Sequence, residues 1–134
     1  MEVVSGAEGV ARETARDASL HHPDARAIIT GIDGDGNPTI QNMTLAEYHA
    51  GTSAAGNPAF WEHEISRVTQ RFGNVAHIWS TYALYDNENG PIKGRGINSI
   101  QLYYDGGRWW ITAWIFDSER PDNPIPPEFL PPGR

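Results

Sequence analysis

The fold is decided by the stretch Val75-Ala-His-Ile-Trp-Ser-Thr-Tyr-Ala-Leu-Tyr85, which is dense in β-branched and aromatic residues. Side chains of these types fit the pleated surface of a sheet, so the stretch predicts one long strand. Gly73-Asn74 directly before it is a hairpin turn signal. The segment before that turn, Phe60 to Arg71, fits either a helix or a strand. We favour a strand, because the segment leads straight into the hairpin.

Two more strands are predicted downstream. The turn-rich stretch Asp86 to Pro91 ends the first long strand, and Arg95 to Tyr104 is again dense in β-formers. Asp105-Gly-Gly107 predicts a tight hairpin turn before the last strand, Arg108 to Phe116. Long strands joined by hairpins make an antiparallel meander. The tail after Asp117 holds six of the ten prolines, so we expect it to be extended and to cross the surface.

The first 32 residues predict a short helix followed by a strand. Residues Ala7 to Ser19 are rich in Ala, Glu and Arg and favour a helix. His22-Pro-Asp24 should break it, because proline disfavours the α region for the residue before it. A strand over Ala25 to Thr30 follows.

A hairpin and a second helix come next. Asp33-Gly-Asp-Gly-Asn37 predicts a turn, and Pro38 to Asn42 predicts a short edge strand. Thr44-Leu-Ala-Glu47 fits a capping box, which predicts a helix over Leu45 to about Ala50. Gly51 to Pro58 is expected to form a loop of small residues.

The composition of the chain argues against several classes of binding partner. The net charge of -7 opposes nucleic-acid binding, and no apolar run is long enough to predict a membrane span. The chain has no cysteine, and neither His21-His22-Asp24 nor Glu62-His63-Glu64 has an established ligand spacing, so we expect neither a metal nor another cofactor. The N-terminus shows no export signal, and the expected location is the cytoplasm.

Five local motifs stand out along the chain: His22-Pro-Asp-Ala25, Phe72-Gly-Asn-Val-Ala-His77 leading into Ser80-Thr-Tyr82, Arg95-Gly-Ile-Asn-Ser-Ile-Gln-Leu102, Asp105-Gly-Gly-Arg-Trp-Trp-Ile111 and Asp117-Ser-Glu-Arg-Pro-Asp-Asn-Pro-Ile-Pro126. Together they resemble the nuclear transport factor 2-like, or SnoaL-like, superfamily, in an uncharacterised bacterial branch. The resemblance runs from about residue 20 to residue 130.

The resemblance implies an α+β fold in which a cone-shaped, curved antiparallel sheet packs against N-terminal helices. We expect one domain over residues 1–134, with a helical segment over 1–22 and an extended tail over 118–134. The resemblance also implies a homodimer formed through the sheet and a small hydrophobic molecule inside the cone. Only 21 residues precede the turn at His22-Pro-Asp24, whereas members of the superfamily begin with longer helices. The cone is therefore expected to be open or closed by a partner.

The first acid/base candidate is Asp117. Alternation along the last strand groups Trp109, Ile111, Ala113, Ile115 and Asp117 on one face, and the resemblance places that face inward. Asp117 would then lie at the mouth of the cone, with Trp109 against the substrate. The alternative is a solvated carboxylate at the end of a strand.

The second catalytic candidate is His77, which shares a face with Trp79. Ser80 and Tyr82 lie on the other face, and only one of the two faces can line the pocket. If His77 faces inward, it is the best proton carrier, because its ordinary pKa lies nearest neutrality. If it faces outward, Tyr82 and Ser80 are the polar groups of the pocket, and His77 lies at a sheet or dimer surface.

Asn98 and Asp24 complete the predicted substrate-binding set. Asn98 is a polar residue within a β-rich strand, and an amide there needs partners. Asp24 resembles the acidic residue that opens the first strand in the superfamily, although it also fits a simple turn. Ketosteroid isomerases have their base a few residues later, where this chain has Ile28-Ile29.

These residues leave three functions open. The chain could be a cofactor-independent lyase, isomerase, hydrolase or cyclase that acts on a hydrophobic compound. It could instead bind such a compound without catalysis, as five tryptophans would suit. A dimeric interaction module is the third alternative.

Overall fold

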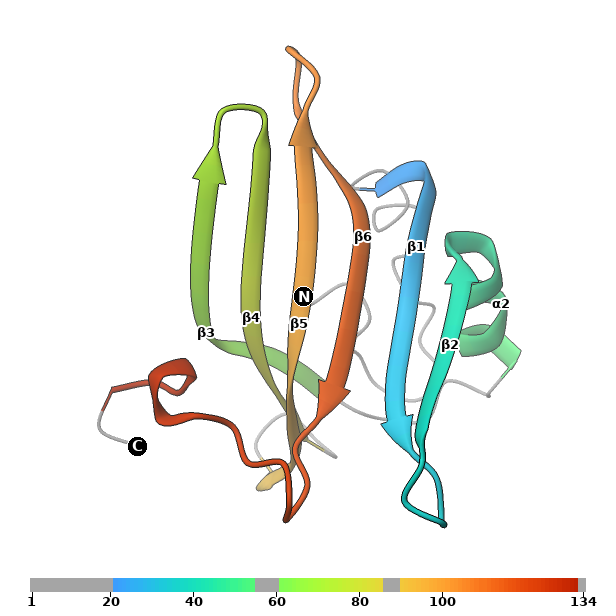
Figure 1. Ribbon diagram of the computed structural model, residues 1–134, viewed down its shortest axis with the longest axis vertical. Coiled ribbons are helices and arrows are strands. Elements are labelled where there is room, and N and C mark those ends of the chain that lie inside the picture. Colours follow the sequence, from blue (N-terminus) through green and yellow to red (C-terminus); the bar gives the residue numbers. More distant parts are fainter. Residues whose placement is uncertain (1–20, 55–60, 86–89, 133–134) are drawn as a thin grey trace.

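The computed structural model describes residues 21–54, 61–85 and 90–132, which form a six-stranded sheet with one α-helix. Figure 1 shows strands β1 (His21–Ile32), β2 (Pro38–Thr44), β3 (Trp61–Phe72), β4 (Val75–Tyr85), β5 (Ile92–Tyr104) and β6 (Trp109–Ser118), helix α2 (Leu45–Ala54), and a 3-10 turn, η1 (Pro127–Phe129), in the tail. All the predicted strands are confirmed. The helix predicted over Ala7 to Ser19 lies outside the described residues.

The strand order is β2-β1-β6-β5-β4-β3. Strands β3 to β6 are antiparallel neighbours in chain order, so the predicted meander is confirmed. β1 pairs with β6 in parallel, which makes the sheet mixed rather than wholly antiparallel. The curved sheet is therefore as expected, but packing against N-terminal helices is not established by the described residues.

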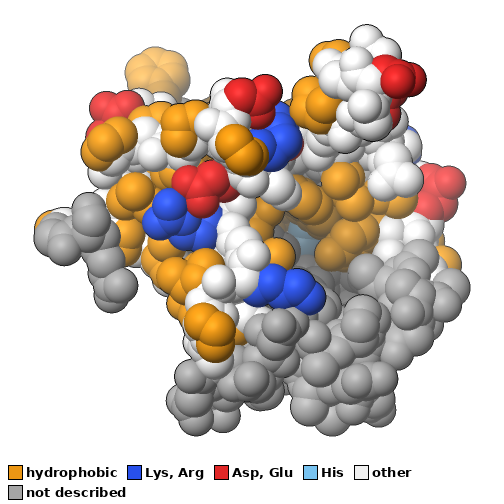
Figure 2. All heavy atoms as spheres, turned by 90° about the horizontal axis from the view of Figure 1, so that it is seen from below, with side chains coloured by type: hydrophobic (Ala, Val, Ile, Leu, Met, Phe, Trp, Pro, Cys, Tyr) orange, Lys and Arg blue, Asp and Glu red, His pale blue; other side chains and the backbone are white. Residues whose placement is uncertain are grey.

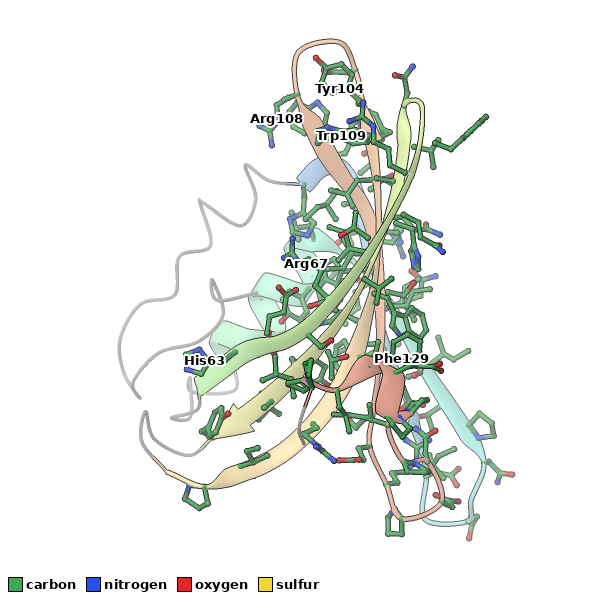
Figure 3. The ribbon with its side chains drawn as sticks, turned by 90° about the vertical axis from the view of Figure 1, so that its left-hand side faces the viewer. His63, Arg67, Tyr104, Arg108, Trp109 and Phe129 are labelled. Carbon is green, nitrogen blue, oxygen red and sulfur yellow. The ribbon has the colours of Figure 1, made fainter. Side chains whose placement is uncertain are left out.

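The sheet has two different faces. It curves around the side that carries α2, which we call the concave face, while the tail crosses the opposite, convex face (Figure 3). The core lies on the concave side around Ala27, Ile100 and Trp114. Tyr48 of α2 packs edge-on against Trp114, with ring centroids 5.0 Å apart. None of the helices in the described part of the chain is long and apolar enough to cross a membrane.

The strand predicted from Ala25 begins four residues earlier, because β1 starts at His21. The helix that the proline was expected to end lies outside the described residues. The register against β6 shifts between His21 and Arg26. An irregularity of this kind accommodates a proline, which cannot donate to the ladder. The predicted turn at Asp33 is confirmed, since the Asp33 carboxylate accepts the amides of Asp35 and Asn37, both at 2.9 Å.

The capping box that begins α2 is confirmed in both directions. The Thr44 amide donates to Glu47 Oε1 at 2.9 Å, and the Glu47 amide donates to Thr44 Oγ1 at 3.0 Å. The predicted loop from Gly51 is wrong in its first residues, because the helix continues to Ala54. Glycine weakens a helix without forbidding it, so its presence did not mark the end.

A bulge in β6 overturns the predicted facing of the last strand. Leu102 pairs with Ile111 while Gln101 pairs with Ala113, so β6 contains one extra residue, Thr112. An extra residue reverses the alternation beyond it. Ile111 lies on the concave face with the core and Trp109 shares its side, but Ala113, Ile115 and Asp117 lie on the convex face. The expected inward position of Asp117 is therefore wrong.

Candidate functional site

The two faces of β4 differ in what covers them. Ser80 and Tyr82 lie on the concave face, where Tyr82 packs edge-on against Phe116 with ring centroids 6.2 Å apart. Phe116 in turn stacks on Trp114 of the core at 5.8 Å. His77 and Trp79 lie on the convex face, beside Phe129 of the tail. Of the two arrangements that the sequence left open, the structure has the one in which His77 points outward.

The concave face is lined by aromatic rings and opens at one end. Tyr48, Trp114, Phe116 and Tyr82 form a continuous series of ring contacts along it. Figure 2 shows the molecule from that end, with a hollow whose wall carries hydrophobic side chains. An aromatic wall of this kind suits an apolar ligand.

Glu62 brings a titratable group to this wall. Burial raises the pKa of its carboxyl from 4.5 to about 7, because a charged carboxylate loses hydration there. Burial also raises the pKa of Tyr82 to about 12; a hydrogen bond with Ser118 lowers it, while the negative charges of Glu62 and Asp117 raise it further. At neutral pH Glu62 is thus divided between its two protonation states, and Tyr82 keeps its proton.

A second carboxylate on β3 is held by partners. Arg67 Nε donates to both Glu64 oxygens, at 2.9 and 3.0 Å, and Ser80 Oγ also donates to Glu64. These contacts keep Glu64 in a fixed position. Glu64 is therefore better suited to positioning than to carrying a proton.

The end of the aromatic wall is shaped by Gly96 and Asn98 of β5. A Cβ atom at Gly96 would collide with the Tyr82 ring and with the Asp117 carbonyl, so Tyr82 packs directly on the glycine backbone. Asn98 is only 5% exposed and lies opposite Ser80 on β4. The structure thus brings together Tyr82 and Asn98, two of the predicted substrate-binding residues.

The other predicted residues lie elsewhere. On the convex face, His77 Nε2 is hydrogen-bonded to Ser99 Oγ at 2.8 Å, and His77 and Trp79 help to line a hollow of about 280 Å³. Asp24 is 94% exposed beside His22, and Trp109 packs against Tyr104 with the Arg71 guanidinium 4.9 Å from its ring. Their roles in catalysis or binding stay predictions.

Asp117 is held by an ion pair. Arg120 Nη1 lies 2.7 Å from Asp117 Oδ1, and this hydrogen bond is the main cause that lowers the pKa of Asp117; the Ser118 amide also lowers it. The carboxylate is ionised at neutral pH and lies on the convex side, and only its charge acts on Tyr82 of the aromatic wall. Both observations weaken the prediction that Asp117 is a general acid.

Sequence reasoning did not single out Glu62 as an acid/base candidate. It considered Glu62-His63-Glu64 only as a metal site, and among the described residues no group of three His, Asp or Glu side chains could hold a metal ion. Strand alternation alone would have placed Glu62 and Glu64 on one face. The remaining signal, burial of Glu62, depends on contacts between strands distant in sequence.

No protein-family model matches the chain, and no curated protein matches it in sequence. Solved structures do match its fold. A protein of unknown function with a cystatin-like fold from Nostoc punctiforme has a TM-score of 0.62 at 13% identity, over 81% of this chain and 78% of its own. A nuclear transport factor 2-like protein from Cytophaga hutchinsonii has a TM-score of 0.60 at 12% identity, over 80% and 83%.

A proposed ketosteroid isomerase from Shewanella frigidimarina is also similar, with a TM-score of 0.55 at 14% identity, over 78% of this chain and 81% of its own. At such identities the likeness establishes the fold alone. The chain has the nuclear transport factor 2-like, or cystatin-like, fold that its motifs indicated. The fold supports several functions, so the choice among them depends on the site.

Proposed function

We propose that this protein binds a small hydrophobic molecule against its concave face and that Glu62 exchanges a proton with that molecule. The observation that carries the proposal is the pKa of Glu62, raised to about 7 by burial beside an aromatic wall. A carboxyl group that titrates near neutrality can both accept and donate a proton under ordinary conditions.

The side chains that share the concave face with Glu62 would have separate roles toward the ligand. The Tyr82 hydroxyl stays protonated and can donate a hydrogen bond to an oxygen that gains negative charge when Glu62 removes a proton. Asn98, which is buried on the same face, can donate or accept a hydrogen bond and so orient the ligand. The rings of Trp114 and Phe116 would pack against its apolar part.

Two measurements test the proposal. Carbon NMR titration of the Glu62 carboxyl should give a pKa near 7; a value near 4.5 would remove the basis for proton transfer. Hydrophobic ketones incubated with the protein in D2O should exchange an acidic C–H, and Glu62→Gln should abolish the exchange. Glu128→Gln is the control, because Glu128 is exposed on the opposite side of the sheet.

A second candidate function is binding without catalysis. Trp114 is 3% exposed, and within the described part of the chain its indole nitrogen has no hydrogen-bond partner. A ligand oxygen on the concave face could accept that hydrogen bond. If ligands bind there and Glu62→Gln changes neither affinity nor any exchange reaction, the non-catalytic function is the correct one.

A further inference from the structure

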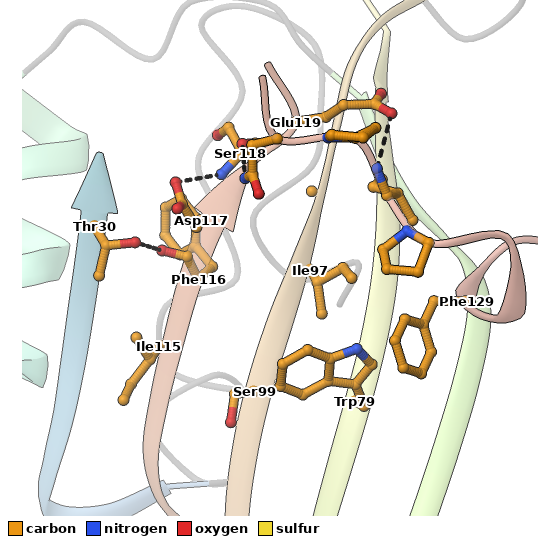
Figure 4. A pocket seen from close by; sticks show the side chains of 15 residues that line it. Thr30, Trp79, Ile97, Ser99, Ile115, Phe116, Asp117, Ser118, Glu119 and Phe129 are labelled. Carbon is orange, nitrogen blue, oxygen red and sulfur yellow. Dashed lines mark hydrogen bonds between the residues drawn. The ribbon is translucent and has the colours of Figure 1, made fainter. Parts of the chain in front are cut away.

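A separate hollow lies on the convex side, between the sheet and the tail. It has a volume of about 370 Å³ and is shown in Figure 4. Small-molecule sites have volumes of roughly 300 to 1,000 Å³. The hollow is on the opposite face of the sheet from Glu62, so it does not belong to the site described above.

The tail segment that roofs the hollow, residues 119–130, is anchored at both ends. At the start, Arg95 forms two hydrogen bonds with the Glu119 carboxylate, at 2.8 and 2.9 Å, and Glu119 also accepts the Ile125 amide. At the end, Thr81 Oγ1 donates to the Phe129 carbonyl at 2.7 Å. Between them, Ile125 is 8% exposed. These contacts hold the roof in one position over the sheet.

The walls are mainly apolar. Ile97 and Ile115 lie on the sheet side, and the Phe129 ring on the tail packs against the Trp79 ring at 5.7 Å. Ile115 is still 37% exposed, because the roof does not close over it completely. The combination of a flat indole and aliphatic side chains fits a planar apolar molecule.

One residue that lines this hollow has a polar atom without a partner in the described part of the chain. The Trp79 indole nitrogen is buried and makes no hydrogen bond to any described residue. Figure 4 shows its ring between Ser99 and Phe129. The Thr30 and Ser99 hydroxyls, which line the hollow, are bonded to the Phe116 carbonyl and to His77, not to the indole. An indole N–H is a donor only, so what it lacks is an acceptor.

The charges around the hollow do not select an ionic ligand. The carboxylates at its rim, Asp117 and Glu119, are paired with Arg120 and Arg95 at 2.7 and 2.8 Å. The two pairs together carry no net charge. An uncharged molecule therefore fits the site better than an ion.

We propose that the hollow under the tail binds a small, uncharged aromatic molecule whose carbonyl oxygen accepts the Trp79 indole hydrogen bond. The Trp79 and Phe129 rings, which contact each other, form one wall of the site, and the isoleucines of the sheet form the other. The aromatic part of the ligand packs between these two walls. This second site does not depend on the proton transfer proposed for Glu62, and either proposal can fail alone.

The test uses 2-acetylnaphthalene as the probe and the indole N–H signals of the ¹⁵N-labelled full chain as the readout. The Trp79 signal, assigned from its loss in Trp79→Phe, should move downfield and saturate. Affinity should fall about tenfold in Trp79→Phe, as expected for the loss of one hydrogen bond. The isostere 2-isopropenylnaphthalene lacks the acceptor. It should bind the wild-type chain as weakly as the ketone binds Trp79→Phe. Ile115→Trp should abolish binding by filling the hollow.

Trp110→Phe is the matched control, because the Trp110 indole already donates to Asp105 Oδ2 at 2.7 Å and Trp110 does not line the hollow. It should leave binding of the probe unchanged. The proposal is overturned if the Trp114 signal responds instead, if the ketone and its isostere bind equally well, or if no signal moves up to the solubility limit.

Discussion

The two faces of the sheet shift the pKa values of their carboxyl groups in opposite directions. On the concave face, burial raises the pKa of Glu62 to about 7. On the convex face, hydrogen bonds from Arg120 and Arg95 are the main causes that lower the pKa values of Asp117 and Glu119. The same chemical group thus titrates near neutrality on one face and forms ion pairs on the other. Residue type alone does not identify a catalytic acid; what it packs against decides its role.

The largest expected difference between the faces is in packing. Trp114 and Ile115 are neighbours in β6, but Trp114 is 3% exposed and Ile115 is 37% exposed. Trp114→Ala should lower the free energy of unfolding by about 3–5 kcal/mol, since it removes a core ring. Ile115→Ala should cost less than about 1.5 kcal/mol. Urea unfolding measures both, and equal losses would show that the convex face is as closely packed as the concave one.

The second largest effect expected is on the free energy of unfolding, and it depends on pH through Glu62 on the concave face. The folded-state pKa of Glu62 lies above its ordinary value of 4.5, so its ionisation opposes folding as the pH rises from about 4.5 to 7. Glu62→Gln should therefore be neutral near pH 4 and stabilise by about 3 kcal/mol at pH 8, as a shift of this size implies. Urea unfolding at both pH values checks this. An effect independent of pH would mean that Glu62 is hydrated, and Glu128→Gln serves as the control.

The close packing of Tyr82 against Gly96 of β5 predicts a smaller effect on stability. Gly96→Ala should destabilise by about 1–3 kcal/mol, because the new methyl group must displace the ring. Gly94 in the same strand has no atom within 4 Å of the position its Cβ would take, so Gly94→Ala should be close to neutral. Thermal unfolding compares the two variants. A neutral Gly96→Ala would show that Tyr82 can move away without loss.

The smallest effect concerns the anchor of the tail. Glu119→Gln weakens the pair with Arg95, whose side chain is 29% exposed, so solvent screens part of the loss and about 1 kcal/mol is expected. Hydrogen exchange should show faster opening at the Ile125 amide, with little change on the concave face. Glu128→Gln in the same tail segment should leave that amide unaffected. Equal protection in both variants would mean that other contacts hold the tail.

The homodimer that the resemblance implies stays a prediction. Phe72 is 88% exposed and Val75 61% exposed at the β3–β4 hairpin, and Val68 of β3 is 39% exposed. Apolar side chains gathered in this way are suited to contact with another chain. Light scattering at micromolar concentration decides between a monomer and a dimer.

Much of the fold could be predicted from local patterns. The long strands, the capping box at Thr44 and the turn at Asp33 each depend on residues close together in the chain, and each was confirmed. The site was harder to predict. Tyr82 and Asn98 lie on one face, although the sequence left the face of each open, whereas Asp117 was placed on the wrong side because the bulge at Thr112 has no sequence signal of its own.

By itself the sequence determined that a curved meander forms and which side chains share a face within an uninterrupted strand, because alternation and turn chemistry are local properties. Only the tertiary structure decided which face of β4 is concave, that β6 reverses its facing at Thr112, and that Glu62 is buried deeply enough to titrate near pH 7. Register shifts and desolvation arise between strands far apart in the chain, and no window of sequence contains both partners.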